Sequence, residues 1–416
     1  MTRVHVASDA AAAPAPTDGR GLGAFPLARW AAGVRYSAMQ DLLTRASRPD
    51  VLSLALGLPD PQLFPKGLYA ELAQRLLRDD PLSLQYAPQY ARLKPHVVSL
   101  MRERGVACTE ADVFLTVGGQ QGLSLLSRLL VDRGGCVLVE ERTYPGLLQA
   151  VQPLEPRVIT VPMDFDGGID IDAVQHHLRR NVRPAFIYVM PDGHNPAGTS
   201  FDERQRERLV ALARDWSVPI IEDDAYGFLQ YDGHVRCPLR ALDAEMVMYV
   251  GSFSKIQAPG LRVGWLVVPR RMMRALSVLK ESSDIDTTTF SQRLVCAYLE
   301  TGALPAHLDL LRRTYTAKRD RMAAALSRAS IARAVWTIPR SGMFILLRLD
   351  DAIDAARLLE QALERERVAF VPGGAFRCSR HDDAETCVRL NFSHPSLEAI
   401  DEGIARLARA ISRYEP

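Results

Sequence analysis

The chain has 416 residues, of which 47% are hydrophobic and 24% are charged, and its formal net charge is +2 at pH 7. A chain of this length buries a large core and corresponds to roughly two to three domain-sized units. The nearly neutral balance argues against a basic surface for nucleic acid or for an anionic membrane.

The N-terminal segment is rich in Ala, Pro and Gly and has no hydrophobic run of the secretory kind, so residues 1–25 are expected to form a disordered tail. No apolar run along the chain reaches the ~18 residues that a membrane span needs. The six cysteines are scattered without CxxC spacing, which indicates reduced thiols rather than a disulfide scaffold or a metal site. We therefore expect a cytoplasmic protein that holds no metal.

The first part of the chain predicts a parallel α/β arrangement. Apolar residues at helical spacing predict helices over 69–77 and 93–101, and short apolar runs then alternate with helical or looped segments. Strands are expected over residues 113–117, 136–140, 158–161, 185–190, 218–222, 246–250 and 263–268. Strands this apolar, separated in this way, are typical of a mostly parallel sheet covered by helices on both faces.

The pattern changes after about residue 290. A long helical segment is expected from 291 towards 325, interrupted at Pro305, followed by strands at 343–349, 368–371 and 388–392 and helices at 352–365 and 397–411. This predicts a smaller α+β unit. The expected division is an N-terminal arm with part of the small domain (26–65), a large domain (66–290) and a C-terminal small domain (291–416).

Lys255 is one of only five lysines, and it ends the loop Gly-Ser-Phe-Ser-Lys between two predicted strands. Most loop lysines are merely exposed. Here, however, Ser252, Ser254 and Arg262 are close in sequence, and hydroxyl, backbone N–H and guanidinium groups together suit a phosphate. A lysine beside a phosphate site suggests a phosphorylated aldehyde held as a Schiff base.

Other polar side chains follow other predicted strands. Taken singly, each has an ordinary interpretation, such as a strand-end Asp turn, a Pro/Gly-rich turn or a loop tyrosine. Together they lie at the carboxyl ends of several strands, where open α/β sheets bind ligands. They are Gly119 and Gln120 of GGQQGL, Tyr144 of ERTYP, Asn195 of PDGHNPAG, and Asp223 and Tyr226 of EDDAY. This distribution favours a pyridoxal-phosphate site, with a carboxylate for the pyridine nitrogen.

These segments resemble fold-type I pyridoxal-phosphate enzymes of the class I/II aminotransferase family. The resemblance is greatest to 2-aminoadipate and kynurenine aminotransferases and to the effector domains of MocR-type regulators. It extends from about residue 26 onward and includes SLALGLPDPQLFP (53–65), LQYAP (84–88), SFSKIQAPGLRVGW and RLNFS (389–393). It implies a large cofactor-binding domain and a smaller α+β domain.

The resemblance also implies a role for each residue of the site. Lys255 would form the Schiff base with pyridoxal 5′-phosphate and shuttle protons, and Asp223 would pair with the pyridine nitrogen. Tyr144 would stack on the ring, while Asn195 and Tyr226 would bind its phenolic oxygen. The phosphate would be held by Gly119, Gln120, Ser252, Ser254 and Arg262.

On the substrate side, the resemblance implies that Arg389 grips the α-carboxylate and that Asn195, Leu56 and Gly57 line the substrate. Tyr86 would reach the phosphate of a neighbouring subunit, which implies a homodimer with shared sites. The expected ligands are an amino acid and a 2-oxo acid, with no nucleic acid and no membrane as partner.

The sequence departs from the family pattern at three places. Gly119 stands where relatives often have Ser or Thr, Leu56 replaces a glycine, and the run at 85–91 lacks the usual glycine. The leading expectation is an aminotransferase. The departures keep open a second one, in which the same cofactor serves elimination, replacement, decarboxylation or oxidation of an amino acid. A third, a non-catalytic regulator, predicts a DNA-binding domain of ~60 residues, for which the N-terminal tail is too short.

Overall fold

The computed structural model describes residues 28–32, 45–46, 48–164, 168–285, 288–378 and 385–415. Contacts divide the chain into two units, Met1–Arg35 and Tyr36–Pro416. The first unit contributes one described helix, α1 (Arg29–Ala32). The tail predicted over residues 1–25 lies outside the described residues.

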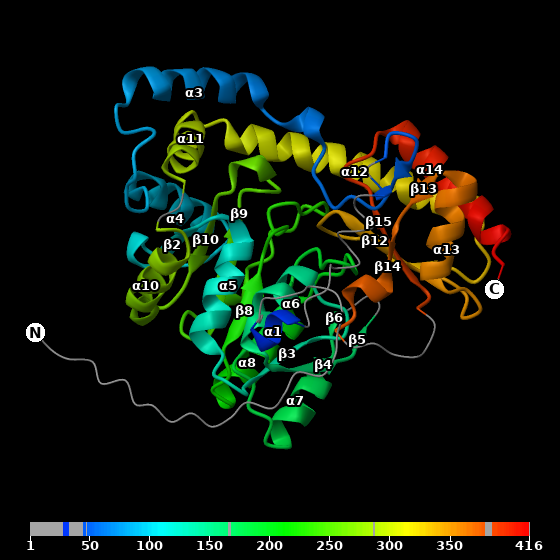
Figure 1. Ribbon diagram of the computed structural model, residues 1–416, viewed down its shortest axis with the longest axis horizontal. Helices are drawn as coiled ribbons and strands as arrows, with labels where there is room; N and C mark the ends of the chain where they lie inside the picture. The colour runs from blue at the N-terminus through cyan, green and yellow to red at the C-terminus, as the bar shows by residue number, and fades with distance from the viewer. Residues whose placement is uncertain are drawn as a thin grey trace, which may run out of the picture. The chain divides into compact units, whose positions relative to one another are not determined.

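The second unit contains a seven-stranded sheet with the order β2-β10-β9-β8-β7-β3-β4 (Figure 1). In this sheet β10 runs antiparallel to β9 and β2, whereas the other neighbours are parallel. The strands are β2 (Val113–Thr116), β3 (Cys136–Glu140), β4 (Arg157–Val161), β7 (Ile187–Val189), β8 (Ile220–Asp223), β9 (Val247–Ser252) and β10 (Gly264–Val267). The mostly parallel sheet predicted from the alternating apolar runs is confirmed.

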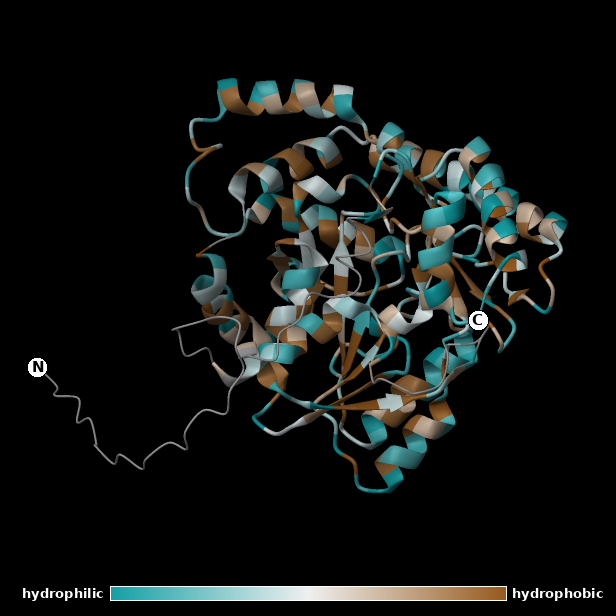
Figure 2. Ribbon diagram, turned by 45° about the vertical axis from the view of Figure 1, so that its right-hand side comes forward, coloured by the Kyte–Doolittle hydropathy of each residue, from teal (hydrophilic) through white to brown (hydrophobic). Residues whose placement is uncertain are grey.

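Helices enclose this sheet. Every strand except the edge strand β4 is buried along its whole length, as expected when both faces are covered. In Figure 2 the strands are largely hydrophobic, and the surrounding helices also show hydrophilic stretches. The helices in this part of the chain are α3 (Lys66–Asp79), α4 (Lys94–Glu103), α5 (Gly118–Leu130), α6 (Pro145–Val151), α7 (Ile171–Arg179), α8 (Glu203–Asp215), α9 (Leu239–Leu242), α10 (Met273–Asp284) and α11 (Thr289–Glu300), of which α3 packs on α11.

Local sequence explains where several of these helices begin. Asp202 and Gln205 form a capping box at the start of α8, and the Asp170 carboxylate caps α7 by accepting from the Ala173 N–H. Pro145 opens α6, where its missing N–H is not needed. No helix in the described part of the chain combines the length and the apolar character that crossing a bilayer requires.

A second, smaller sheet is formed by the C-terminal part of the chain. It is antiparallel, with the order β11-β12-β15-β14. Its strands are β11 (Val335–Trp336), β12 (Phe344–Arg348), β14 (Val371–Pro372) and β15 (Cys387–Asn391), and the helices beside it are α12 (Leu304–Ala329), α13 (Ala355–Gln361) and α14 (Leu397–Ser412). The predicted α+β character of this region is confirmed, whereas the boundaries after residues 65 and 290 stay predictions.

Short elements complete the second unit. β1 (Leu52–Ser53) pairs in parallel with β13 (Val368–Ala369), so an early segment lies beside a late one. β5 (Met163–Asp164) and β6 (Gly168–Ile169) form a small antiparallel pair. The 3-10 turns are η1 (Pro61–Leu63), η2 (Ala91–Leu93), η3 (Glu110–Asp112), η4 (Gln152–Leu154), η5 (Pro259–Leu261), η6 (Arg270–Met272) and η8 (Gly373–Phe376), and η7 (Ala362–Glu366) is a π-helical turn.

The interruption expected near Pro305 in the helical segment from 291 towards 325 is confirmed, because α11 ends at Glu300 and Pro305 opens the first turn of α12. Two other predicted elements differ from the structure. The strand expected over 368–371 is split between β13 and β14, which pair in different sheets. The helix expected over 352–365 begins only at Ala355, where the Asp354 carboxylate caps it, and ends in the π turn η7.

The six cysteines are all described and form no disulfide bond, in agreement with the predicted reduced thiols. Cys296 lies with His96 and Glu300 in a group whose ligand atoms are within 4.8 Å of one another. The guanidinium of Arg92 binds Glu300 at 2.8 Å, so the charge that would attract a cation there is already paired.

Candidate active site

The predicted site residues meet around one cavity of about 510 Å³, which also receives residues from the C-terminal region. Its lining is Leu56, Gly57, Leu58, Gly119, Gln120, Leu123, Tyr144, Pro145, Gly146, Gln149, Met190, Asn195, Asp223, Ala225, Tyr226, Ser252, Ser254, Lys255, Pro259, Arg262, Phe376 and Arg389. Most of the predicted residues lie at or after the carboxyl ends of β2, β3, β7, β8 and β9. The sheet therefore brings together side chains that are far apart in sequence, as expected from their positions at strand ends.

Lys255 follows β9 and its amine points to the cavity. Its Nζ donates a hydrogen bond to the backbone oxygen of Gly57 at 3.0 Å. Burial, and to a lesser degree the positive charges of Arg389 and Arg262, lower the pKa of the Lys255 amine to about 8. A larger fraction of this amine is therefore neutral near physiological pH than for an ordinary lysine, and the neutral form serves as a nucleophile and as a base.

Asp223 is the last residue of β8 and is only 5% exposed. Its Oδ2 accepts a hydrogen bond from the Tyr188 hydroxyl at 2.8 Å. Burial raises the pKa of the Asp223 carboxyl to about 7, even though the Tyr188 bond acts in the opposite direction. Within the described residues this carboxylate forms no ion pair, so a cationic group of a ligand would meet an uncompensated partner.

Arg389 extends from β15 into the cavity and is 3% exposed. Its Nη1 donates to Asn195 Oδ1 at 2.9 Å and its Nη2 donates to the backbone oxygen of Ala55 at 2.6 Å. The guanidinium lies 4.4 Å from the ring centre of Phe344 and 4.9 Å from that of Phe376. Its buried Nε has no hydrogen-bond partner among the described residues, and an unpaired buried donor of this kind calls for an acceptor from a ligand.

The start of α5 forms an anion cradle. Gly119 and Gln120 lie in its first turn, whose N–H groups have no partner within the helix. Gly118 has a φ of +70°, and a Cβ there would lie 2.6 Å from Arg262 Nη2, so only glycine lets the guanidinium approach this closely. That Nη2 donates to the backbone oxygen of Val117 at 3.2 Å, which fixes the cation at the helix start.

Two serines and two tyrosines complete this wall. The Ser252 hydroxyl donates to Ser254 Oγ at 3.0 Å. Tyr144 caps α6, and burial raises the pKa of its hydroxyl. Burial likewise raises the pKa of the Tyr226 hydroxyl, and its ring packs edge-on against Phe344 at 5.8 Å. Both tyrosines therefore stay protonated and act as hydrogen-bond donors.

Tyr86 is the one predicted site residue that the structure does not bring to the cavity. It lies in the segment between α3 and η2, and it is 81% exposed. The neighbouring Leu77, Leu82 and Leu84 are also exposed, by 52%, 55% and 77%.

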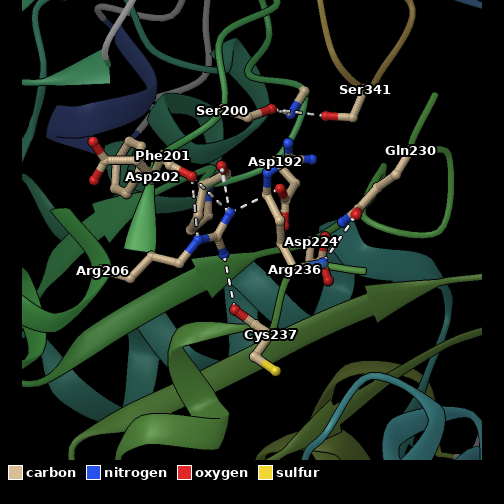
Figure 3. Close-up of polar contacts among 12 residues, drawn as sticks. Asp192, Ser200, Phe201, Asp202, Arg206, Asp224, Gln230, Arg236, Cys237 and Ser341 are labelled. Atoms are coloured by element: carbon tan, nitrogen blue, oxygen red, sulfur yellow. Dashed lines mark hydrogen bonds and ion pairs between the residues drawn. The ribbon is translucent and has the colours of Figure 1, made fainter. Parts of the chain in front are cut away.

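A buried group of charges lies behind the cavity and was not predicted. Arg104 donates from Nη1 to Asp224 Oδ2 at 2.9 Å and from Nη2 to Asp192 Oδ2 at 3.3 Å. Arg206 binds the other oxygen of Asp192 at 2.8 Å, and Figure 3 shows its guanidinium between that carboxylate and backbone oxygens. The Tyr249 hydroxyl also donates to Asp224, at 2.9 Å. Each of the four charged side chains is at most 4% exposed. The positive charges of the two arginines therefore balance the negative charges of the two aspartates in the interior.

A second buried pair joins two loops of the site. Nε2 of His194 lies 2.8 Å from Oε2 of Glu140, and both side chains are fully buried. The backbone N–H of Ala197 donates to His194 Nδ1 at 3.3 Å, so Nε2 is the ring nitrogen that faces the carboxylate. Glu140 ends β3 just before the Tyr144 loop, and His194 directly precedes Asn195. The pair therefore holds these two loops together.

Comparisons with known proteins show which family this chain resembles. The family profile described as "Aminotransferase class I and II" matches residues 50–407. An aromatic-amino-acid aminotransferase of Thermococcus litoralis is 36% identical over 390 residues, which are 92% of this chain and 93% of the relative.

Solved structures give the same result. A kynurenine aminotransferase of Pyrococcus horikoshii superposes with a TM-score of 0.87 at 34% identity, over 93% of this chain and 96% of the other. An α-aminoadipate aminotransferase of Thermus thermophilus, complexed with N-(5′-phosphopyridoxyl)-L-leucine, superposes with a TM-score of 0.85 at 35% identity, over 93% and 97% of the two chains.

Proposed function

The chain belongs to the class I and II aminotransferase family, and from this premise we propose how its cavity serves the reaction. The enzyme uses pyridoxal 5′-phosphate and moves an amino group from an α-amino acid to a 2-oxo acid. The observation that carries our assignment of the site is the unpaired Nε of the buried Arg389, in the same cavity as Lys255 and Asp223.

The residues around the cavity fit this cofactor. Asp223, a buried carboxylate without an ion pair in the described chain, suits the protonated ring nitrogen. The start of α5, together with Ser254 and Arg262, suits the phosphate. We assign the remaining contacts to the residues named from the sequence, which line the same cavity: Gly119, Gln120 and Ser252 at the phosphate, and Tyr144, Asn195 and Tyr226 at the ring.

Proton movement falls to Lys255. When bound, pyridoxal phosphate supplies an aldehyde that reacts with amines and a ring that accepts the negative charge developing at the substrate α-carbon. We assign Lys255 as its covalent attachment point. With the cofactor bound, a free Lys255 Nζ would take the α-proton of the substrate, and its lowered pKa matches it to that task. The Asp223 carboxylate would hold the proton on the ring nitrogen.

Substrate orientation falls to Arg389. Its Nε and an Nη group can bind both oxygens of the α-carboxylate in a fork. Asn195 and the Ala55 carbonyl hold the other side of the guanidinium, and the two phenylalanine rings fix its plane. A substrate bound in this way is oriented before reaction, which lowers the entropic part of the barrier.

A second candidate function rests on Leu56. This side chain lines the cavity next to Gly57, whose carbonyl receives the Lys255 hydrogen bond. A bulky residue there narrows the part of the cavity that receives the substrate. It favours a reaction of the same cofactor other than amino transfer, namely elimination, replacement, decarboxylation or oxidation. Identification of the products by mass spectrometry distinguishes the two, because only transfer leaves the carboxylate and side chain of the donor intact and also moves its amine to a second 2-oxo acid.

We also propose a homodimer in the cytoplasm. Tyr86 is exposed and is not part of the described cavity lining, as expected if it serves a partner subunit. The exposed Leu77, Leu82 and Leu84 offer apolar surface for that contact. The six free cysteines are in keeping with a reducing compartment.

The test combines isotope transfer with substitution of Arg389. With a ¹⁵N-labelled amino acid and a second 2-oxo acid, the label is expected in the new amino acid. Arg389→Lys keeps the charge but loses the fork, so the KM for the donor is expected to rise on the order of 10- to 100-fold. Arg313→Lys, an exposed position on α12, is the control. Consumption of the donor without transfer of label would contradict the assignment.

The attachment point is tested separately. Borohydride reduction of the purified enzyme, followed by peptide mapping, is expected to find the pyridoxyl group on Lys255. A label on another lysine would show that the cavity has been assigned to the wrong function.

A further inference from the structure

We propose that the amino acid converted by this enzyme has an uncharged, apolar side chain, and that Leu56 and Leu58 form the wall against which it packs. The inference rests on the proposed function, because it concerns the donor bound in the same cavity. It names the class of substrate that the described walls accept.

The charges of the cavity are all engaged once the cofactor and the α-carboxylate are bound. Four charged side chains line the described cavity, namely Asp223, Lys255, Arg262 and Arg389. Under the proposed function, Arg262 binds the phosphate and Arg389 binds the α-carboxylate. Lys255 is engaged at the reacting centre, first as the attachment point and then as the base for the α-proton. Among the described lining residues, no cation then remains for a second carboxylate. Asp223 is likewise engaged by the ring, so a basic side chain finds no anion there.

The place next to the α-carboxylate has apolar walls. Gly57 lies against Arg389, because a Cβ at Gly57 would be 3.7 Å from Arg389 Nη1. Leu56 and Leu58 flank this glycine and both line the cavity. The ring of Phe376 lies on the guanidinium at 4.9 Å and also lines the cavity. A substrate held by Arg389 therefore places its side chain beside hydrocarbon.

Leu58 is an unusual wall residue because it is 44% exposed while facing a cavity. An apolar substrate side chain covers such a surface and removes it from water, which favours binding. A carboxylate of similar size would lose its own hydration there without gaining a partner. We expect discrimination on the order of 100-fold in kcat/KM from this difference.

The first experiment compares donors with the holoenzyme. Transfer of ¹⁵N to a fixed 2-oxo acid is measured for L-leucine, L-phenylalanine and L-methionine and for L-glutamate and L-2-aminoadipate. Higher kcat/KM for the apolar group is the expected result, and equal or higher values for the acidic group overturn the proposal. Transfer from no donor at all would instead contradict the proposed function.

A binding measurement decides the question without turnover. 3-Phenylpropanoate and glutarate share one carboxylate for Arg389 and differ in the rest. We expect calorimetry on the holoenzyme to give a dissociation constant at least about 10-fold lower for 3-phenylpropanoate. A preference for glutarate would show that a second cation reaches the cavity and would refute the inference.

A substitution locates the selectivity. Leu58→Arg places a cation at the wall and is expected to shift the ratio of acidic to apolar kcat/KM by at least about 10-fold towards the acidic donors. Leu310→Arg on α12 is the matched control, because Leu310 is 40% exposed and lies outside the cavity lining. An unchanged ratio in Leu58→Arg would remove Leu58 from the substrate wall.

Discussion

Replacing Arg104 by methionine is expected to destabilise the protein strongly, although Arg104 does not line the cavity. The substitution removes a buried guanidinium that binds Asp224 and Asp192. Asp192 keeps Arg206, but Asp224 is left with the neutral hydroxyl of Tyr249 as its remaining hydrogen-bond donor among those described. Methionine fills much of the same space, so the loss is mainly electrostatic.

The magnitude follows from the burial of this group. Removing one partner of a buried ion pair costs about 3–5 kcal/mol of unfolding free energy. With about 2.1 cal/mol/K of unfolding entropy per residue, the 416-residue chain has an unfolding entropy of roughly 0.9 kcal/mol/K, so Tm falls by roughly 3–6 °C. Adding Asp224→Asn removes the stranded negative charge and is expected to recover more than half of the loss.

Urea unfolding at pH 7, followed by circular dichroism, measures these differences. Arg102→Met on the same helix is the control, because Arg102 is exposed and its replacement should change stability by less than about 0.5 kcal/mol. If Arg104→Met were no less stable than Arg102→Met, or if Asp224→Asn made it worse, the balanced-charge explanation would be refuted.

Three further predictions concern the site. Burial holds the pKa of the Asp223 carboxyl near 7, so the unfolding free energy of the wild-type apoprotein falls as pH rises from about 4 to 7. Asp223→Asn lacks this fall, so its unfolding free energy relative to wild type should rise by roughly 2–3 kcal/mol between pH 5 and pH 8. Urea unfolding at both pH values measures the difference. Gly118→Ala displaces the arginine of the phosphate cradle and should raise the cofactor Kd at least about 10-fold in fluorescence titrations, whereas Gly67→Ala, which meets nothing within 4 Å, should not. Glu140→Leu leaves the imidazole of His194 without its carboxylate and should lower the unfolding free energy by about 1–3 kcal/mol. An unchanged Tm in thermal unfolding would show that this pair does not stabilise the site.

Much of the sheet and of the cavity could be predicted, because both depend on simple patterns. The buried strands are short apolar runs, and parallel strands bring their carboxyl ends to one edge. Asn195, Asp223 and Lys255 lie at or just after the carboxyl ends of three different strands, so their meeting in one cavity was predictable from these positions. Arg389 needed the family resemblance, because nothing local distinguishes it from other strand arginines.

The supporting contacts could not be predicted, because they depend on the directions of side chains across distant segments. Tyr188 lies in a predicted strand, but only the packed sheet shows its hydroxyl on Asp223. Arg104 comes from the end of a helix, 120 residues before its partner Asp224. The division of residues 368–371 between two sheets likewise depends on β1, a two-residue strand too short to give a periodic signal.

The pairing of β1 with β13 has a consequence for the order in which the enzyme is completed during synthesis. The segment just after β1 provides the carbonyl oxygens of Ala55 and Gly57, which position Arg389 and Lys255. Ala55 and Arg389 are 334 residues apart. The ribosome therefore adds the two halves of this contact 334 residues apart, so a nascent chain holds a finished cofactor pocket only after Arg389 has emerged.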